Sequence, residues 1–211
     1  MSAFRWVLSA EEAAACINRG ATVWDARRQL IWLWKHVAGS QSVQWQAFSQ
    51  SDPTRRGLLS DRPDSQAEIL QKLGVDRDRP VIVVGNPQSP WGEEGRLVWT
   101  LRSLGHERAA WVDGGWTALR SRVPLRRGSE SNPKPGAFSP QLDSTWTATC
   151  EDVRSIANNS NSEWVLLDTR SPREFAGATP YGESRGGRIP GAKSFPLQKL
   201  RQEDGFLRSP E

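Results

Sequence analysis

Cysteine is scarce in this 211-residue chain, which contains only Cys16 and Cys150. Neither has another metal-binding side chain at ligand spacing, and the pair alone makes no disulfide framework or zinc-finger type of site. Long apolar runs are also missing, since none approaches the roughly 20 residues that a membrane helix needs. The first nine residues lack the apolar stretch of a signal peptide. We therefore expect a cytoplasmic protein with no membrane partner, no metal and no cofactor.

The charge of the chain is moderately basic, with a net value of +4. Much of the excess lies in one stretch, at Arg120, Arg122, Arg126, Arg127 and Lys134. This stretch runs into residues rich in Pro, Gly and Ser, and no nucleic-acid-binding motif accompanies it. We interpret it as a solvated linker and expect no nucleic-acid partner.

One pattern occurs twice: an apolar strand that ends in Asp-x-Arg, then a basic residue, two further residues and a Gly. The copies are Asp25 and Arg27 with 36–39, and Asp168 and Arg170 with 188–191. The two Asp residues are 143 positions apart (168 minus 25), which is about the length of a small domain. A repeat at this distance predicts two versions of one structural unit.

The first copy alternates helices and strands. Ser9 and Glu12 form a capping box that starts a helix ending near Asn18. The remaining elements are predicted from apolar periodicity and from Gly and Pro punctuation, as strand 21–24, helix 65–73, strand 80–84, helix 93–104 and strand 109–112. Between the first strand and the second helix we expect an irregular segment. This alternation predicts a mainly parallel sheet covered on both faces.

The second copy begins after a stretch at 122–145 that holds four prolines. Thr149 and Asp152 form another candidate capping box, for a helix at 150–157. A strand at 164–167 leads to the second Asp, and the sequence at 209–211 has the pattern of a helix start. We predict a first domain at 1–121, a linker at 122–145, and an incomplete second domain at 146–211.

Together these features resemble the tandem-domain rhodanese family, the thiosulfate and 3-mercaptopyruvate sulfurtransferases. No single short piece is specific, but their order, spacing and duplication are. The segments that carry the resemblance are 24–27, 36–39, 51–54, 73–75, 81–84, 105–106, 113–116, 167–170, 188–192, 203–206 and 209–211. The resemblance implies an α/β fold: a rhodanese-like three-layer domain with a mainly parallel central sheet, followed by an incomplete second copy.

The resemblance also implies a reaction. In this family a Cys thiolate of the second domain takes sulfane sulfur from a small anionic donor, thiosulfate or 3-mercaptopyruvate, and becomes a persulfide. It then passes the sulfur to a thiol or cyanide acceptor. The loop that carries this Cys opens a helix, where backbone N–H groups favour anions. We expect the protein to work as a monomer.

The corresponding loop of the first copy, 85–92, contains no Cys. Ser89 is its only hydroxyl, and because the sequence shows no acid–base partner we interpret it as a turn or cap residue. Glu93 and Glu94 follow at the expected helix start, where their charge opposes anion capture. These residues predict an inactive first domain.

The catalytic Cys expected from the resemblance is not in these 211 residues. Gly85 lies 60 positions after Asp25, and the same spacing from Asp168 places the second loop beyond Glu211. Cys16 lies among alanines on an apolar helix face and is interpreted as a core thiol. The thiol of Cys150 lies in a first helical turn, on the wrong element, and is interpreted as structural or incidental.

Arg170 matches the Arg that helps to bind the anionic donor in the family, and it is the predicted substrate-binding residue. The alternative is a structural salt bridge with Asp168. For Arg27, its counterpart, the structural interpretation is favoured. His36 is interpreted as a hydrogen-bonded loop residue, and Arg188 departs from the His that is common at this position of the family.

Two functions remain open from the sequence. One is a rhodanese-type sulfurtransferase whose 211 residues are inactive alone, because no catalytic residue lies among them. The alternative is a non-catalytic rhodanese-fold module used for binding or regulation.

Overall fold

The computed structural model describes residues 4–52, 55, 57–159 and 162–209. The chain divides into two compact units: unit 1 is Met1–Trp146 with Asp204–Phe206, and unit 2 is Thr147–Glu203 with Leu207–Glu211. The predicted helix start at 209–211 rests on Pro210 and Glu211, which lie outside the described residues, as do Pro53 and Thr54.

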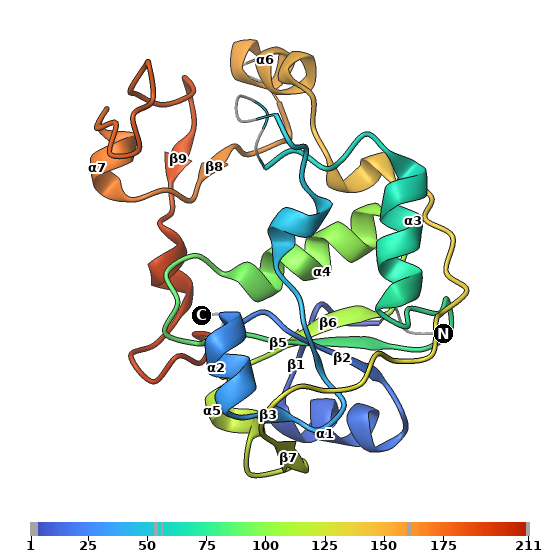
Figure 1. Ribbon diagram of the computed structural model, residues 1–211. Coiled ribbons are helices and arrows are strands. Elements are labelled where there is room, and N and C mark those ends of the chain that lie inside the picture. Colours follow the sequence, from blue (N-terminus) through green and yellow to red (C-terminus); the bar gives the residue numbers. More distant parts are fainter. Residues whose placement is uncertain (1–3, 53–54, 56, 160–161, 210–211) are drawn as a thin grey trace. The chain divides into compact units, whose positions relative to one another are not determined.

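A five-stranded sheet forms the centre of unit 1, and all of its pairings are parallel (Figure 1). The strands run in the order β1-β6-β5-β2-β4. Their bounds are β1 Val7–Leu8, β2 Thr22–Asp25, β4 Gln41–Ser42, β5 Val81–Val84 and β6 Ala109–Val112. The predicted α/β fold with a mainly parallel sheet is therefore confirmed. A separate antiparallel pair joins β3 (His36–Val37) to β7 (Leu125–Arg126).

Helices cover both faces of this sheet, which gives three layers (Figure 1). In β5, Val81 and Val83 pack with one core cluster, while Ile82 and Val84 pack with the other. This alternation follows from the two-residue period of a strand, and β5 is apolar throughout because both of its faces are buried. The helices of unit 1 are α1 Ala10–Asn18, α2 Gln29–Trp34, α3 Pro63–Lys72, α4 Glu93–Ser103 and α5 Gly115–Leu119, with 3-10 turns at Trp45–Phe48 and Ser144–Trp146.

Local sequence signals account for most of these boundaries. Ser9 caps α1, its hydroxyl accepting from the Glu12 N–H while Glu12 accepts from the Ser9 N–H, as predicted. Helix α2 was not predicted, because five of its six residues are apolar and show no amphipathic period. Its first residue follows Arg28, whose side chain makes no capping hydrogen bond. The expected irregular segment therefore contains α2, β3 and β4.

Residues 122–145 run extended along unit 1, and we call residues 123–143 the strap. Val123 and Phe138 of the strap are buried, and Phe138 joins the core cluster that contains α4. Its backbone is held too, since the Phe138 N–H donates to the Val75 carbonyl at 3.1 Å and the Gln141 N–H to the Leu104 carbonyl at 2.9 Å. The strap therefore contributes to the stability of unit 1.

Substituting Phe138→Ala should lower the free energy of unfolding by about 3–5 kcal/mol, because it removes a buried aromatic ring from the core and leaves a cavity. Leu142→Ala is the matched control, since Leu142 is 71% exposed in the same stretch. Equilibrium urea unfolding measures both. Equal, small losses in the two variants would show that the strap is only a solvated linker.

Unit 2 contains α6 Cys150–Asn158, β8 Leu167–Asp168, α7 Pro172–Phe175, β9 Lys193–Ser194 and a 3-10 turn at Leu197–Leu200. The Thr149–Asp152 capping box is present as predicted. Strand β8 pairs with β9 in parallel and starts three residues later than the predicted strand. Trp164 and Val165 precede it and are 74% and 59% exposed, so the expectation that a strand begins at Trp164 is wrong. Among the described residues, no helix is long and apolar enough to cross a membrane.

Candidate functional site

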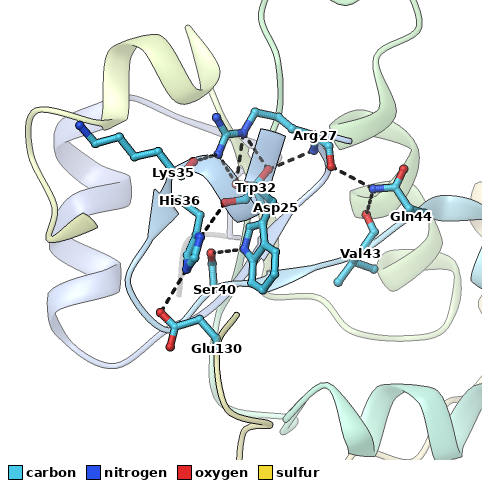
Figure 2. Close-up of polar contacts among 9 residues, drawn as sticks. All are labelled: Asp25, Arg27, Trp32, Lys35, His36, Ser40, Val43, Gln44 and Glu130. Carbon is cyan, nitrogen blue, oxygen red and sulfur yellow. Dashed lines mark hydrogen bonds and ion pairs between the residues drawn. The ribbon is translucent and has the colours of Figure 1, made fainter. Parts of the chain in front are cut away.

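Asp25 and Arg27 of unit 1 form a buried ion pair at the carboxyl end of β2 (Figure 2). The Arg27 Nε donates to Asp25 Oδ1 at 2.9 Å, and one terminal nitrogen donates to Oδ2 at 2.6 Å. That same nitrogen donates to the Lys35 carbonyl at 2.8 Å. The two side chains are 1% and 4% exposed, and the Arg27 guanidinium stacks on Trp116 at 3.8 Å. Arg27 is therefore structural, as the sequence favoured.

Asp168 and Arg170 of unit 2 repeat this geometry. The Arg170 Nε donates to Asp168 Oδ1 at 3.0 Å, and one terminal nitrogen donates to Oδ2 at 2.7 Å. The same nitrogen donates to the Gly187 carbonyl at 2.8 Å, and Gly187 precedes Arg188 as Lys35 precedes His36. These Arg170 hydrogen bonds hold the pKa of Asp168 below its ordinary value. Both alternatives for Arg170 thus have a physical basis: it is in the salt bridge, and its side chain is 45% exposed.

A cavity of about 810 Å³ lies beside Arg170 within unit 2. Its lining comes from the end of β8, from the loop before β9 and from one α6 residue, Val153. Three arginines line it, Arg170, Arg185 and Arg188. Arg185 makes no hydrogen bond or ion pair with any described residue. Such a cluster favours small anions, because guanidinium groups bind oxyanions through several donors at once.

Cys150 is the cysteine of unit 2, and Cys16 belongs to unit 1. Cys150 is the first residue of α6 and is exposed, but it is absent from the cavity lining. Cys16 belongs to α1 of unit 1 and is half-buried against one core cluster. The interpretation of Cys16 as a core thiol therefore holds only in part, and the Cys150 thiol is not part of the lining that holds the three arginines.

The loop between β5 and α4 in unit 1 is held by hydrogen bonds among its own residues. The Ser89 N–H donates to the Asn86 carbonyl at 2.9 Å, and the Gln88 N–H donates to Asn86 Oδ1 at 3.1 Å. The Ser89 hydroxyl donates to Glu93 at 2.6 Å and accepts from the Trp91 N–H. The Ser89–Glu93 hydrogen bond was not predicted from the sequence. It closes a turn, which agrees with the interpretation of Ser89 as a turn or cap residue. Because these N–H groups are used within the loop, they do not form an anion cradle.

His36 is fully buried in β3 and has an acceptor at each ring nitrogen (Figure 2). Nδ1 lies 2.7 Å from the Trp32 carbonyl, and Nε2 lies 3.2 Å from Glu130 Oε1. Each ring nitrogen of His36 therefore faces one acceptor, and Nε2 faces the Glu130 carboxylate. His36 is hydrogen-bonded, as expected, but it lies in a strand.

Glu130 was not found from the sequence, because it lies in the strap, 94 residues from its partner His36. Its carboxylate is 5% exposed and also accepts from the Gly39 N–H at 2.8 Å. Burial acts to raise the pKa of Glu130, but the Gly39 N–H, His36 and Arg126 lower it, and the net pKa is below the ordinary value. Glu130 thus fastens the strap to the loop that follows β3.

Comparison with known proteins decides the family. The model of the rhodanese-like domain matches residues 9–122, which is more than half of the chain. The chain belongs to the rhodanese family. The rhodanese-like match ends close to the start of the strap, and unit 2 lies outside it.

Individual relatives of this rhodanese-like chain include sulfur-transfer proteins. It is 29% identical over 188 residues to the sulfur carrier protein TtuD of Thermus thermophilus, covering 83% of this chain and 63% of that protein. It is 30% identical over 150 residues to the human 3-mercaptopyruvate sulfurtransferase, covering 69% of this chain and 49% of that enzyme. The chain therefore spans about half to two thirds of the length of these relatives.

Solved structures agree with the fold. The structure of SseA from Escherichia coli, a 3-mercaptopyruvate sulfotransferase described with the rhodanese fold, matches with a TM-score of 0.77 and 26% identity. The match covers 97% of this chain and 79% of that one.

Asp25→Asn should destabilise the protein by about 3–5 kcal/mol, because it leaves the buried Arg27 charge without its carboxylate. Asp168→Asn is the matched substitution in the exposed copy, with an expected loss of about 1 kcal/mol or less. Urea unfolding compares the two variants. Equal losses would show that burial does not distinguish the two pairs.

Glu130→Gln should lower the stability near neutral pH by about 1–2 kcal/mol, because the buried carboxylate and its hydrogen bonds to the Gly39 N–H and His36 are weakened. The folded pKa of Glu130 lies below the ordinary 4.5, so its contribution is present above pH 4.5 and is lost as the pH falls through the folded value. The difference from wild type should therefore shrink as the pH is lowered below 4.5.

Unfolding measured near neutral pH and again below pH 4.5 tests this expectation for Glu130. Glu68→Gln serves as the control, since Glu68 is 69% exposed in a surface pair with Lys72. A deficit in Glu130→Gln that stays constant with pH would contradict a stabilising charge on Glu130.

Proposed function

We propose that this chain serves sulfur transfer of the rhodanese type and binds the anionic sulfur donor in the arginine-lined cavity of unit 2. The observation that carries the proposal is the convergence of Arg170, Arg185 and Arg188 on one cavity. Family membership supports the reaction class, and relatives bear the names 3-mercaptopyruvate sulfurtransferase and sulfur carrier protein. The donor is thiosulfate or 3-mercaptopyruvate, and the acceptor is a thiol or cyanide.

Arg170 and Arg185 have different roles in this proposal. Arg170 is oriented by Asp168 and by the Gly187 carbonyl, so one edge of its guanidinium is held while the rest remains accessible. Arg185 has no partner among the described residues and supplies a second cation. Two guanidinium groups neutralise a dianion such as thiosulfate better than one.

The reaction itself requires a thiolate. It attacks the outer sulfur of thiosulfate, the S–S bond breaks, and sulfite leaves with the bonding electron pair. The enzyme then carries a Cys persulfide, and an acceptor thiolate or cyanide attacks its outer sulfur and regenerates the thiolate. Cys16 packs against a core cluster of unit 1, and Cys150 is absent from the cavity lining, so we propose that neither is this nucleophile.

A second candidate is a non-catalytic rhodanese-fold module for binding or regulation. The observation that favours it is the cysteine-free loop 85–92 of unit 1, whose polar groups hydrogen-bond within the loop. Both candidates require the cavity to bind an anion, and they differ in turnover.

Thiosulfate titration of the 211-residue chain, followed by calorimetry, should show saturable binding that Arg185→Ala weakens by about tenfold, the effect of losing one charged hydrogen-bond donor. Arg173→Ala is the matched control, since Arg173 is exposed but lies outside the cavity lining. If thiosulfate does not bind, or if both variants bind it equally well, the proposal that the cavity binds the donor is wrong.

Turnover is measured on the same protein as thiocyanate formed from thiosulfate and cyanide, and we expect background rates. Robust production that Cys150→Ser abolishes would overturn the assignment of Cys150 as a non-nucleophile.

A further inference from the structure

The second half of the strap lies against the segment that follows α3 in unit 1. The Ala137 N–H donates to Asp76 Oδ1 at 2.8 Å, and the Phe138 N–H donates to the Val75 carbonyl at 3.1 Å. A Cβ atom on Gly136 would overlap the Val75 carbonyl, so only glycine permits this close approach of the two backbones. Residues 136–138 of the strap therefore fit tightly onto residues 75–76.

His106, which follows α4, packs against the same part of the strap. Its ring is 1% exposed and meets the Phe138 ring edge-on, with centroids 5.1 Å apart. Nε2 lies 3.0 Å from the Asp76 carbonyl. Because a carbonyl only accepts, Nε2 carries the proton, and Nδ1 of the neutral ring carries none. Nδ1 is buried and has no hydrogen-bond partner within the described part of the chain.

A second proton on His106 is costly in this position. The ring would hold a positive charge away from water, and its new N–H would have no hydrogen-bonding acceptor among the described residues. Burial is the largest cause that lowers the pKa of His106, and the charge of Arg102 lowers it further. Hydrogen bonds with backbone groups, chiefly that of Asp76, raise the pKa, but the net value lies below the ordinary 6.5.

The charged side chains around His106 do not offset this cost. They are Asp76, Arg77, Arg79, Arg102 and Glu107. The Asp76 carboxylate pairs with Arg79 at 2.9 Å, and Glu107 interacts with Arg102. Since both acids already have cationic partners, the three arginines oppose a further positive charge.

We propose that His106 makes the attachment of the strap sensitive to acid: protonation of its ring detaches residues 136–138 and exposes Phe138. The neutral ring fits the closed contact, whereas the charged ring is stable only where water reaches it. Phe138 belongs to the core cluster that contains residues of α4, so this local opening also exposes apolar surface of that cluster. The device is independent of the proposed sulfur transfer.

The closed contact is strongest near neutral pH. In the open form the His106 ring is hydrated and titrates near the ordinary 6.5, whereas in the closed form its pKa is lower. The contribution of the neutral ring is therefore complete above pH 6.5 and is lost as the pH falls from 6.5 toward the lower value. Each pH unit in this window weakens closure by up to about tenfold. The window begins above pH 4.5, below which the contribution of Glu130 is lost.

Hydrogen exchange followed by mass spectrometry measures the opening in the 211-residue chain. Exchange is compared at about pH 7 and about pH 5, after correction for the intrinsic rate at each pH, because these values bracket the ordinary pKa of histidine. Protection of peptides within 133–142 should fall about tenfold at the lower pH. Peptides that cover the fully buried β5 should keep their protection, since the opening is local.

Substitutions identify the group that titrates. His106→Gln keeps an N–H for the Asp76 carbonyl but takes up no proton, so its protection should be the same at both pH values. Asp76→Asn is the matched control, because it keeps an acceptor for the Ala137 N–H and removes the other titratable group. This variant should retain the response to acid.

Two outcomes of the exchange experiment would overturn the proposal: wild-type protection within 133–142 that does not change between the two pH values, or a response to acid that His106→Gln retains. The NMR titration of the His106 ring signals in the wild-type protein applies whether or not His106→Gln folds. We expect a pKa below 6.5, and a value at or above 6.5 would contradict the proposal.

Discussion

The other polar contacts at this end of unit 1 are arranged around the buried ion pair between Asp25 and Arg27. Asp25 is the last residue of β2. The Arg27 guanidinium that pairs with it also donates to the Lys35 carbonyl, just before the first residue of β3. Removing two charges from water is costly, and the pair is stable only because its geometry is bidentate and Trp116 covers the cation. His36 of β3 then contacts Glu130 of the strap, which extends this series of polar contacts.

The copy of this pair in unit 2 shows how one arrangement supports two roles. Asp168 and Arg170 make the same hydrogen bonds as Asp25 and Arg27, at nearly the same distances. The environment differs, because Arg170 is 45% exposed beside a cavity and Arg27 is 4% exposed beneath Trp116. Solvent access therefore distinguishes a stabilising arginine from one that is available to a ligand, and the Asp-x-Arg motif alone does not.

Sequence reasoning succeeded where the signal is local. Both capping boxes are formed by residues three positions apart, and the buried strand β5 is a continuous β-branched run, so each signal lies within a few residues. It failed at α2, whose apolar residues lack a helical period, and at Trp164, where an apolar segment is exposed. These elements depend on what packs against them, and that information is not local.

The sequence by itself determined the family, the parallel α/β architecture of unit 1 and the recurrence of the Asp-x-Arg motif, because these follow from order, spacing and local propensity. Only the tertiary structure decided which arginines share a cavity, that Ser89 pairs with Glu93, and that Glu130 binds His36 from 94 residues away. The physical reason is that burial and electrostatic pairing depend on distances in space, which residues distant in sequence acquire only when the chain folds.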